Sequence, residues 1–386
     1  MTVEFVVLIV AAAQAFLLAL LIYQKHRSLY ANRFLSLMML AGGIAVLHML
    51  AQDNGFYDAY PRLLYAVLGI PFLVGPLHYL YTKYLVYGGN TFARRDLVHF
   101  VSPAVVEALA LAAIVTLPGR TAEVLNSNAE LVPLQFKLYN WILIVFGIAY
   151  TLISLRILLR YGSTVKDVVS SLEKVRLNWL TMLSVAALAL WTMFLFENTL
   201  MTFGINLTNF VLTTVCGGIY IYGIGYSGLL KSEVFAAPGV GDVMQEISRA
   251  AAEQNTPGRK YRKSGLDDAS AEAIVLALKT FMEKERPYAD PSLTLTGLAK
   301  RLSVSPHNLS EAINSRINKK FYDLINEYRI VQVKKDLSDP SKRDLKILAI
   351  AFDAGFNSKA SFNEIFKSST GLTPSEYRNR LLTNLQ

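Results

Sequence analysis

Apolar residues dominate the first 230 positions of the chain and become sparser afterwards. Seven apolar stretches of about 18–24 residues are each long enough to cross a hydrocarbon layer of about 30 Å as a helix. They are Phe5–Tyr23, Phe34–Ala51, Leu63–Thr82, Leu97–Leu117, Leu138–Leu159, Trp179–Leu200 and Leu207–Leu230. Prolines interrupt the third and fourth stretches, which membrane helices tolerate when neighbouring helices cover the freed carbonyl groups. The pattern predicts an all-α fold that opens with a seven-helix transmembrane sensor bundle over residues 1–230.

The pattern changes across residues 231–265, which we interpret as a linker. Pro238-Gly239 and Thr256-Pro257-Gly258 mark loops there, and 243–252 could form a short helix between them. A basic cluster at 259–263 fits a solvated linker or, alternatively, contact with anionic lipid or DNA phosphate. From 266 to 386 apolar residues recur at helical spacing within polar segments, which predicts a soluble helical domain.

The soluble domain is predicted to start with a helix over Asp268–Glu285, ended by Pro287 and Pro291. A pair of short helices follows, with Thr294 and Ser305 as their N-terminal caps. The inward-facing residues of this pair are predicted to be Leu295, Leu298, Ala299, Leu302, Leu309, Ala312 and Ile313. A long helix over Phe321–Leu337 then connects this pair to the last part of the chain.

A second pair of short helices is predicted on either side of Gly355, where closely crossing helices need a small residue that is free to turn. Asn357 or Ser358 can cap its second helix. The predicted apolar faces are Leu345, Leu348, Ala349 and Phe352 on the first helix, and Phe362, Ile365 and Phe366 on the second. Both pairs have the pattern of a helix-turn-helix, although a helical hairpin without a DNA role is the simpler alternative.

The run from Ala351 to Lys367, closed by Gly-Leu-Thr-Pro-Ser-Glu-Tyr-Arg at 371–378, resembles the second helix-turn-helix of AraC/XylS-type transcription regulators. The resemblance covers about residues 266–380, and parts of the sequence look like those of membrane-tethered members. Gly297 and Ser303 depart from the residues that are usual in the family. It implies two helices that read successive major-groove faces about 34–36 Å apart. It also implies double-stranded DNA and RNA polymerase as partners, with no enzymatic activity and no cofactor.

The side chains on the outer faces of the two reading helices divide by the contacts they can make. Those able to donate to or accept from base edges are His307, Ser310, Glu311, Asn314, Lys359, Ser361, Asn363 and Glu364. The cations expected on phosphates are Arg316, Lys319, Lys320 and Lys367. The glutamates could instead repel phosphate or pair with a basic neighbour. For Arg329 we expect a salt bridge to Glu327 or Asp323.

Composition and charge support this division. The chain is 53% hydrophobic and 17% charged, which is unusually apolar for a soluble protein of 386 residues. Residues 258–386 contain 22 of the 38 Lys and Arg, and most of the net charge of +9. The single cysteine, Cys216, excludes an intrachain disulfide. The histidines lack metal-ligand spacing, which argues against a zinc enzyme in the bundle.

The loops predict how the bundle is oriented. Segments after the first, third and fifth apolar stretches, counted with Arg156 near the end of the fifth, carry eleven Lys and Arg, against three after the second, fourth and sixth. Because positive loops stay in the cytoplasm, we expect a multi-pass protein of the bacterial inner membrane with its N-terminus outside. An odd number of spans then places the C-terminal domain in the cytoplasm.

Polar residues within the apolar stretches are candidates for detecting a small-molecule or membrane signal. We single out Glu107 and His78, for which a structural hydrogen bond is the simpler reading. Glycines in the last stretch allow close helix packing, which makes a homodimer plausible. Two alternatives stay open: a transporter or membrane enzyme with a regulatory DNA-binding tail, and a tail that binds a protein partner.

Overall fold

The computed structural model describes residues 3–24, 30–87, 92–116, 134–172, 177–205, 211–236 and 266–383, and helices make up most of them. By their contacts the chain forms two compact units. One is Met1–Leu159 with Leu177–Pro238, and the other is Arg160–Arg176 with Gly239–Gln386. The domain limits expected from the sequence, 230 and 266, leave 160–176 in the first domain. Most of the linker, including its basic cluster and the short helix expected at 243–252, lies outside the described residues.

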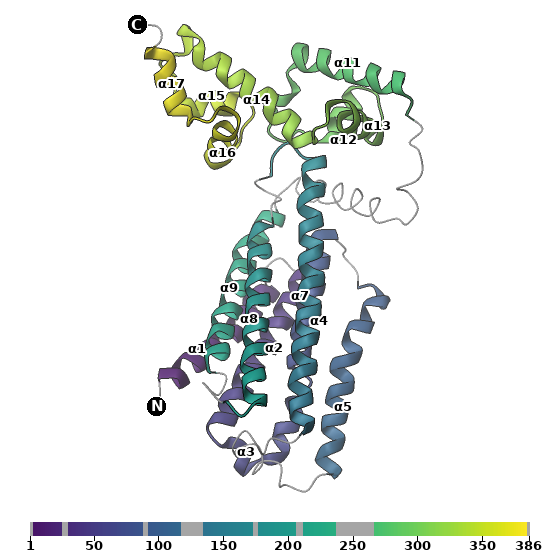
Figure 1. Cartoon of the computed structure of the whole chain (residues 1–386), viewed down its shortest axis with the longest axis vertical. Helices are drawn as coiled ribbons and strands as arrows, with labels where there is room; N and C mark the ends of the chain where they lie inside the picture. The colour runs from purple at the N-terminus through teal and green to yellow at the C-terminus, as the bar shows by residue number, and fades with distance from the viewer. Residues whose placement is uncertain are drawn as a thin grey trace. The chain divides into compact units, whose positions relative to one another are not determined.

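The first unit is a bundle of long helices (Figure 1). Its elements are α1 (Val3–Gln24), α2 (Tyr30–Asp53), α3 (Phe56–Ala59), η1 (Pro61–Val67), α4 (Pro71–Tyr87), η2 (Arg94–Phe100), α5 (Val101–Thr116), α7 (Leu134–Val168), α8 (Asn178–Thr202) and α9 (Val211–Ala236). The residues of α7 from Arg160 onward belong to the second unit.

Several of these helices are suited to a membrane. Five described segments are long and apolar enough to cross one: Phe5–Gln24, Tyr30–Gln52, Arg62–Tyr87, Lys137–Val168 and Asn178–Thr202. A shorter apolar helix covers Val215–Leu230, and α5 has 16 residues. A helix thus occurs in each of the seven predicted stretches, while a count of seven spans stays a prediction.

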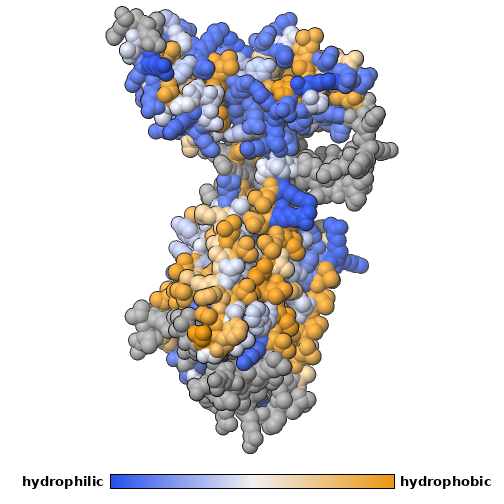
Figure 2. Space-filling view, viewed as in Figure 1, coloured by the Kyte–Doolittle hydropathy of each residue, from blue (hydrophilic) through white to orange (hydrophobic). Residues whose placement is uncertain are grey.

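The surface of the bundle is apolar where a soluble protein would be polar. Large side chains such as Leu109 and Met182 are about two-thirds exposed, at 67% and 68%. Figure 2 shows hydrophobic residues across the described surface of the bundle and hydrophilic ones across much of the second unit. Exposed apolar area on this scale indicates association with lipid.

The glycines of α9 pack against helices of the same chain. A Cβ atom on Gly228 would lie 2.2 Å from the side chain of Leu35, and one on Gly225 would lie 2.7 Å from the sulfur of Met39. These two glycines therefore bring α9 close to α2 within the bundle. Because this packing already uses them, they give no separate argument for a dimer.

The second unit contains the predicted soluble helices (Figure 1). They are α11 (Asp268–Glu285), η5 (Pro287–Ala289), α12 (Leu295–Arg301), α13 (Pro306–Ala312), η6 (Ile313–Ile317), α14 (Phe321–Ser338), η7 (Pro340–Lys342), α15 (Ile347–Asp353), α16 (Lys359–Thr370) and α17 (Pro374–Thr383). The predicted helix over Asp268–Glu285 is confirmed at both ends, and the long connecting helix differs from the prediction by one residue.

Two hydrophobic cores share the helix α14. Its first half contributes Phe321, Leu324 and Ile325 to a core with α11, α12 and α13. Its second half contributes Ile330 and Val333 to a core with α15 and α16. Each helix pair therefore has its own core, and one continuous helix fixes the spacing of the two.

The caps of the short helices follow the sequence prediction. The Thr294 hydroxyl accepts a hydrogen bond from the Gly297 amide, and the Ser305 hydroxyl accepts one from the Asn308 amide. Ser303, which stands where a turn glycine is more usual, adopts a left-handed conformation with φ of 57°. The turn forms despite a cost of about 1–2 kcal/mol for a side chain in that conformation.

The predicted apolar face of α15 is wrong. Leu345 and Phe352 are 42% and 46% exposed, whereas Ile350, Ala351 and Ala354 are buried. Two adjacent stripes of this helix both have helical spacing, so periodicity alone does not separate them. The stripe with two alanines is the buried one, which fits a close crossing of helices. The prediction for α16 is confirmed, since Phe362 and Phe366 are buried and Ile365 packs against the same core.

Gly355 is required at its position for two independent reasons. Its φ of 99° lies in a region that favours glycine. A Cβ atom there would also lie 2.2 Å from the carbonyl oxygen of Tyr288 and 2.9 Å from Nε of Arg329. The turn of the second helix pair is thus pressed against the segment that follows α11.

We therefore expect Gly355→Ala to destabilise α15 and α16 by more than about 3 kcal/mol, because strain and a backbone clash combine. Gly371→Ala is the matched control: its φ is also positive, at 75°, but nothing lies within 4 Å of an added Cβ. It should cost about 1–2 kcal/mol. Hydrogen exchange of the α15 and α16 amides in the full-length protein measures both, and equal losses would contradict the clash.

Candidate nucleic-acid interface

The first reading helix, α13 with its continuation η6, presents its predicted base-contacting residues on the side away from the hydrophobic core. Leu309, Ala312 and Ile313 are buried, while His307 and Asn314 are exposed and Ser310 and Glu311 are half-buried. Residues one helical turn apart on this face contact each other. Nδ1 of His307 lies 3.7 Å from Oε2 of Glu311, and the Asn314 amide donates to the Ser310 hydroxyl at 3.4 Å. Such weak contacts leave His307, Ser310 and Asn314 available to base edges, whereas Oε2 of Glu311 is buried and has no hydrogen-bond partner among the described residues.

The second reading helix, α16, is organised in the same way. Phe362 and Phe366 anchor it, and the Ser358 hydroxyl caps it by accepting from the Ser361 amide at 3.3 Å. The predicted contact residues Lys359, Asn363, Glu364 and Lys367 are all exposed, and Ser361 is half-buried. Hydrogen-bond donors and acceptors therefore both lie on the exposed face of the helix, as the reading of base edges in the major groove requires.

Three of the predicted phosphate-binding cations already have acidic partners. Arg316 pairs with Asp268. Lys319 lies 2.5 Å from Glu327, and Lys320 lies 3.2 Å from Asp167. The pairs of Arg316 and Lys319 have exposed acids and contribute about 0–1 kcal/mol, so a phosphate can displace the acid at little cost, whereas Asp167 is only 20% exposed.

The closing motif at 371–378 has a structural explanation. Thr373 and Glu376 form a reciprocal cap: the Thr373 amide donates to the Glu376 carboxylate at 2.8 Å, and the Glu376 amide donates to the Thr373 hydroxyl. The first of these bonds lowers the pKa of Glu376. The Arg378 guanidinium donates to the carbonyls of Lys342, Arg343 and Leu345. The motif therefore holds α17 against the loop before α15, a structural role that does not depend on contact with DNA.

The salt bridge predicted for Arg329 is wrong. Its side chain is 1% exposed, and Glu327 pairs with Lys319 instead. The guanidinium donates to the carbonyl oxygens of Tyr288, Asp290 and Ser170 at 2.8–2.9 Å, and to the Ser170 hydroxyl at 3.0 Å. Burial lowers the pKa of Arg329 to about 10, so it stays charged near neutral pH. Helical spacing suggested a surface pair because it does not show which polar residues face inward.

Ser170 belongs to a segment that the sequence assigned to a loop between membrane helices. The Ser170 amide donates to the Leu293 carbonyl at 3.1 Å, and Val169 forms an antiparallel bridge with Thr294. The Ser171 hydroxyl donates to the side-chain oxygen of Asn357 at 3.0 Å. The segment thus touches the start of the first helix pair and the turn of the second. Sequence reasoning missed it because the apolar run ends at Leu159, whereas the helix continues to Val168.

The two candidates for detecting a signal, Glu107 and His78, have different hydrogen-bond partners. A carboxylate oxygen of Glu107 accepts from the Gly69 amide at 2.7 Å. His78 is buried with Nε2 lying 3.1 Å from the Ser184 hydroxyl, and its Nδ1 has no partner among the described residues. Both have a structural role available. The described residues also contain no group of three or more His, Cys, Asp or Glu side chains that could hold a metal ion.

Comparison with known proteins supports the reading of the second unit. Residues 298–380 match a family described as Helix-turn-helix domain. A 176-residue stretch is 27% identical to the uncharacterized transcriptional regulatory protein YesN of Bacillus subtilis (strain 168), covering 44% of this chain and 45% of that protein. The chain thus aligns with less than half of that relative. No solved structure matches the chain. The C-terminal part carries a helix-turn-helix domain of the AraC type, which is a DNA-binding domain of transcription regulators.

Replacing the buried guanidinium tests how much the second unit depends on it. Arg329→Met keeps the apolar stem but leaves four buried acceptors without their donor, so we expect a loss of about 2–4 kcal/mol. Arg301→Met is the control, because Arg301 is half-exposed and 3.9 Å from Asp290; it should cost less than about 1 kcal/mol. Urea unfolding followed by hydrogen exchange in α14 gives both values. Similar losses would show that the buried bonds contribute little.

Proposed function

We propose that this chain is a membrane-bound, sequence-specific transcription regulator that binds DNA from the bacterial inner membrane and responds to a signal in its helical bundle. The observation that carries the proposal is the second unit: two capped helix-turn-helix pairs, each with its own core, on the shared helix α14. The apolar helices of the first unit support the membrane location.

In this proposal the two reading helices divide the work by chemistry. Asn314 and Asn363 pair with adenine, the exposed glutamate of α16 accepts from cytosine, and Lys359 donates to base edges. The paired cations Arg316, Lys319 and Lys320 exchange their acids for phosphates, and Lys367 binds phosphate directly. RNA polymerase and a second copy of the chain are the partners we expect on the promoter.

The segment at 160–171 supplies the connection between signal and DNA. It continues helix α7 of the bundle and is bonded to both helix pairs of the second unit. A change in α7 therefore reaches the readers through ordered contacts as well as through the linker at 231–265. Because those contacts include Lys320 with Asp167, they also compete with a predicted phosphate contact.

Two substitutions on α16 separate base reading from phosphate binding. Asn363→Ala should cost about 1–3 kcal/mol at one base pair and relax specificity there. Lys367→Ala should weaken all duplexes alike and reduce the slope of log affinity against log salt by about one. Lys279→Ala, on the exposed side of α11, is the control and should change neither.

The measurement is a mobility shift with full-length protein in lipid nanodiscs, using a duplex taken from a genome-wide binding selection. Failure of that selection to retain any specific duplex would contradict the proposal.

Reporter fusions test the orientation. Because the positive loops are expected inside, alkaline phosphatase fused after Gln386 should be inactive, and a fluorescent protein there should be bright. A phosphatase fusion after Ile205, between α8 and α9, should be active. An active phosphatase after Gln386 would place the DNA-binding domain outside the cell, where it could not regulate transcription.

A further inference from the structure

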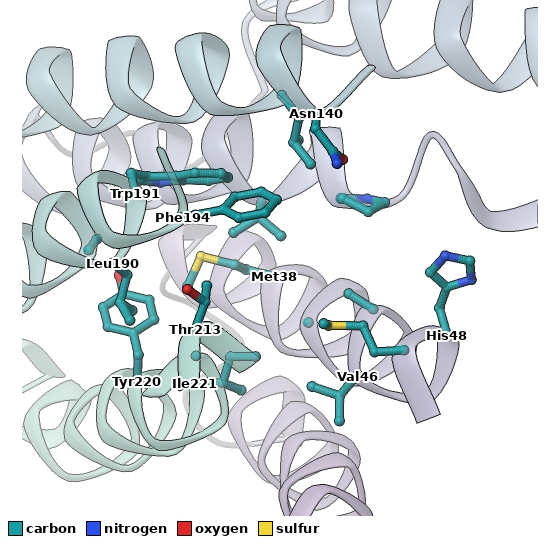
Figure 3. Close-up of a pocket in the computed structure, with 18 of the residues that line it drawn as sticks. Met38, Val46, His48, Asn140, Leu190, Trp191, Phe194, Thr213, Tyr220 and Ile221 are labelled. Atoms are coloured by element: carbon teal, nitrogen blue, oxygen red, sulfur yellow. The ribbon is translucent and has the colours of Figure 1, made fainter. Parts of the chain in front are cut away.

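The bundle has a partly open cavity of about 410 Å³ between α2, α4, α7, α8 and α9. Figure 3 shows its lining, with Trp191, Phe194 and Met38 facing the space that Asn140 and Tyr220 border. The volume is within the range of about 300–1,000 Å³ that is usual for small-molecule sites. The cavity lies wholly within the first unit and contains neither of the two residues singled out from the sequence, Glu107 and His78.

Two glycines shape the walls of this cavity. A Cβ atom on Gly147 would lie 2.2 Å from the indole of Trp191, and one on Gly42 would lie 2.8 Å from Ile221. Gly147 thus lets the indole lie directly against α7, and Gly42 lets α9 approach α2. The aromatic wall is therefore fixed by backbone packing, as a preformed site requires.

The lining disfavours an ionised ligand. Its described residues include no Asp, Glu, Lys or Arg, and Nδ1 of His48 in the lining is already hydrogen-bonded to the Tyr57 hydroxyl at 2.7 Å. The acid nearest in sequence to the lining residues of α8, Glu197, already accepts a hydrogen bond from Thr213. A charged ligand would therefore be buried without a counter-charge, at a cost of several kcal/mol. A neutral molecule meets no such penalty.

Two polar groups of the lining are available to such a molecule. The Asn140 amide and the Tyr220 hydroxyl have no hydrogen-bond partner among the described side chains and backbone, and both residues are half-buried. An amide and a phenol can each donate and accept. They match a carbonyl, a hydroxyl or an amide on the ligand, while the aromatic and methionine side chains match an apolar body.

We propose that this cavity binds a neutral, mainly apolar small molecule that carries a carbonyl, hydroxyl or amide group. Asn140 and Tyr220 bind the polar group, and Trp191 and Phe194 contact the apolar part. The proposal rests on the proposed function, since it names the class of signal that the bundle recognises. The other occupant of an apolar cavity in a bundle is an acyl chain of a bulk phospholipid, and the test below distinguishes it.

Trp191 provides the readout. The chain has three tryptophans, so full-length protein with Trp141→Phe and Trp179→Phe in lipid nanodiscs reports on Trp191 alone. The probes are 8-bromo-1-octanol, which is neutral, and 8-bromooctanoate, which has the same chain with a charge; bromine quenches tryptophan on contact. We expect saturable quenching by the alcohol and only weak, linear quenching by the carboxylate.

Matched variants locate the site. Asn140→Leu with Tyr220→Phe removes two hydrogen bonds of about 0.5–1.5 kcal/mol each, which corresponds to about a tenfold loss of affinity. Ala45→Phe fills the cavity and should abolish saturable quenching. Ala104→Phe adds the same ring on the exposed side of α5 and should change nothing.

Linear quenching by both probes would mean that bulk lipid occupies the space, and saturable quenching that is unchanged in Ala45→Phe would mean that the probe binds elsewhere. Either result would overturn the proposal. The same nanodiscs carry the mobility-shift test. Specific DNA binding without saturable quenching removes only the cavity proposal, whereas saturable quenching without specific DNA binding removes the proposed function.

Discussion

The buried guanidinium of Arg329 determines how the second unit can be built. Removing an arginine from water costs several kcal/mol unless its donors are satisfied, and here the donor and its acceptors come from three separate segments. Tyr288 and Asp290 follow α11, Ser170 follows α7, and the arginine itself lies on α14. All three segments must therefore be in position before the charge can be buried, so these hydrogen bonds form together when the second unit folds.

The burial of Arg329 also fixes the geometry of the two helix-turn-helix pairs. Arg329 lies between the residues of α14 that build the first core and those that build the second. Gly355, in the turn of the second pair, approaches the same guanidinium and the Tyr288 carbonyl so closely that no side chain fits. The second reader is therefore packed against the segment after α11 as well as against α14. Two attachments fix an orientation that one helix alone would leave free to rotate.

Sequence reasoning succeeded where local rules dominate. The limits of α11 and α14, the caps Thr294, Ser305 and Ser358, and the buried faces of α13 and α16 follow from periodicity and capping chemistry. It failed where tertiary contact decides between equal local choices, as with the two apolar stripes of α15 and the buried position of Arg329. The cavity could not be foreseen either, because its walls depend on which glycines meet which side chains across helices.

Helix α7 has residues in both of the regions to which we assign a function, the cavity and the second unit. Its first half supplies Asn140 to the cavity, and its last residues precede the bridge to Thr294 in the second unit. A ligand can shift an equilibrium only by its difference in affinity for two states. The cavity would therefore have to change shape along α7 for a signal to alter DNA binding. A movement of α7 at Gly147 would also shift Trp191, because no side chain lies between this glycine and the indole.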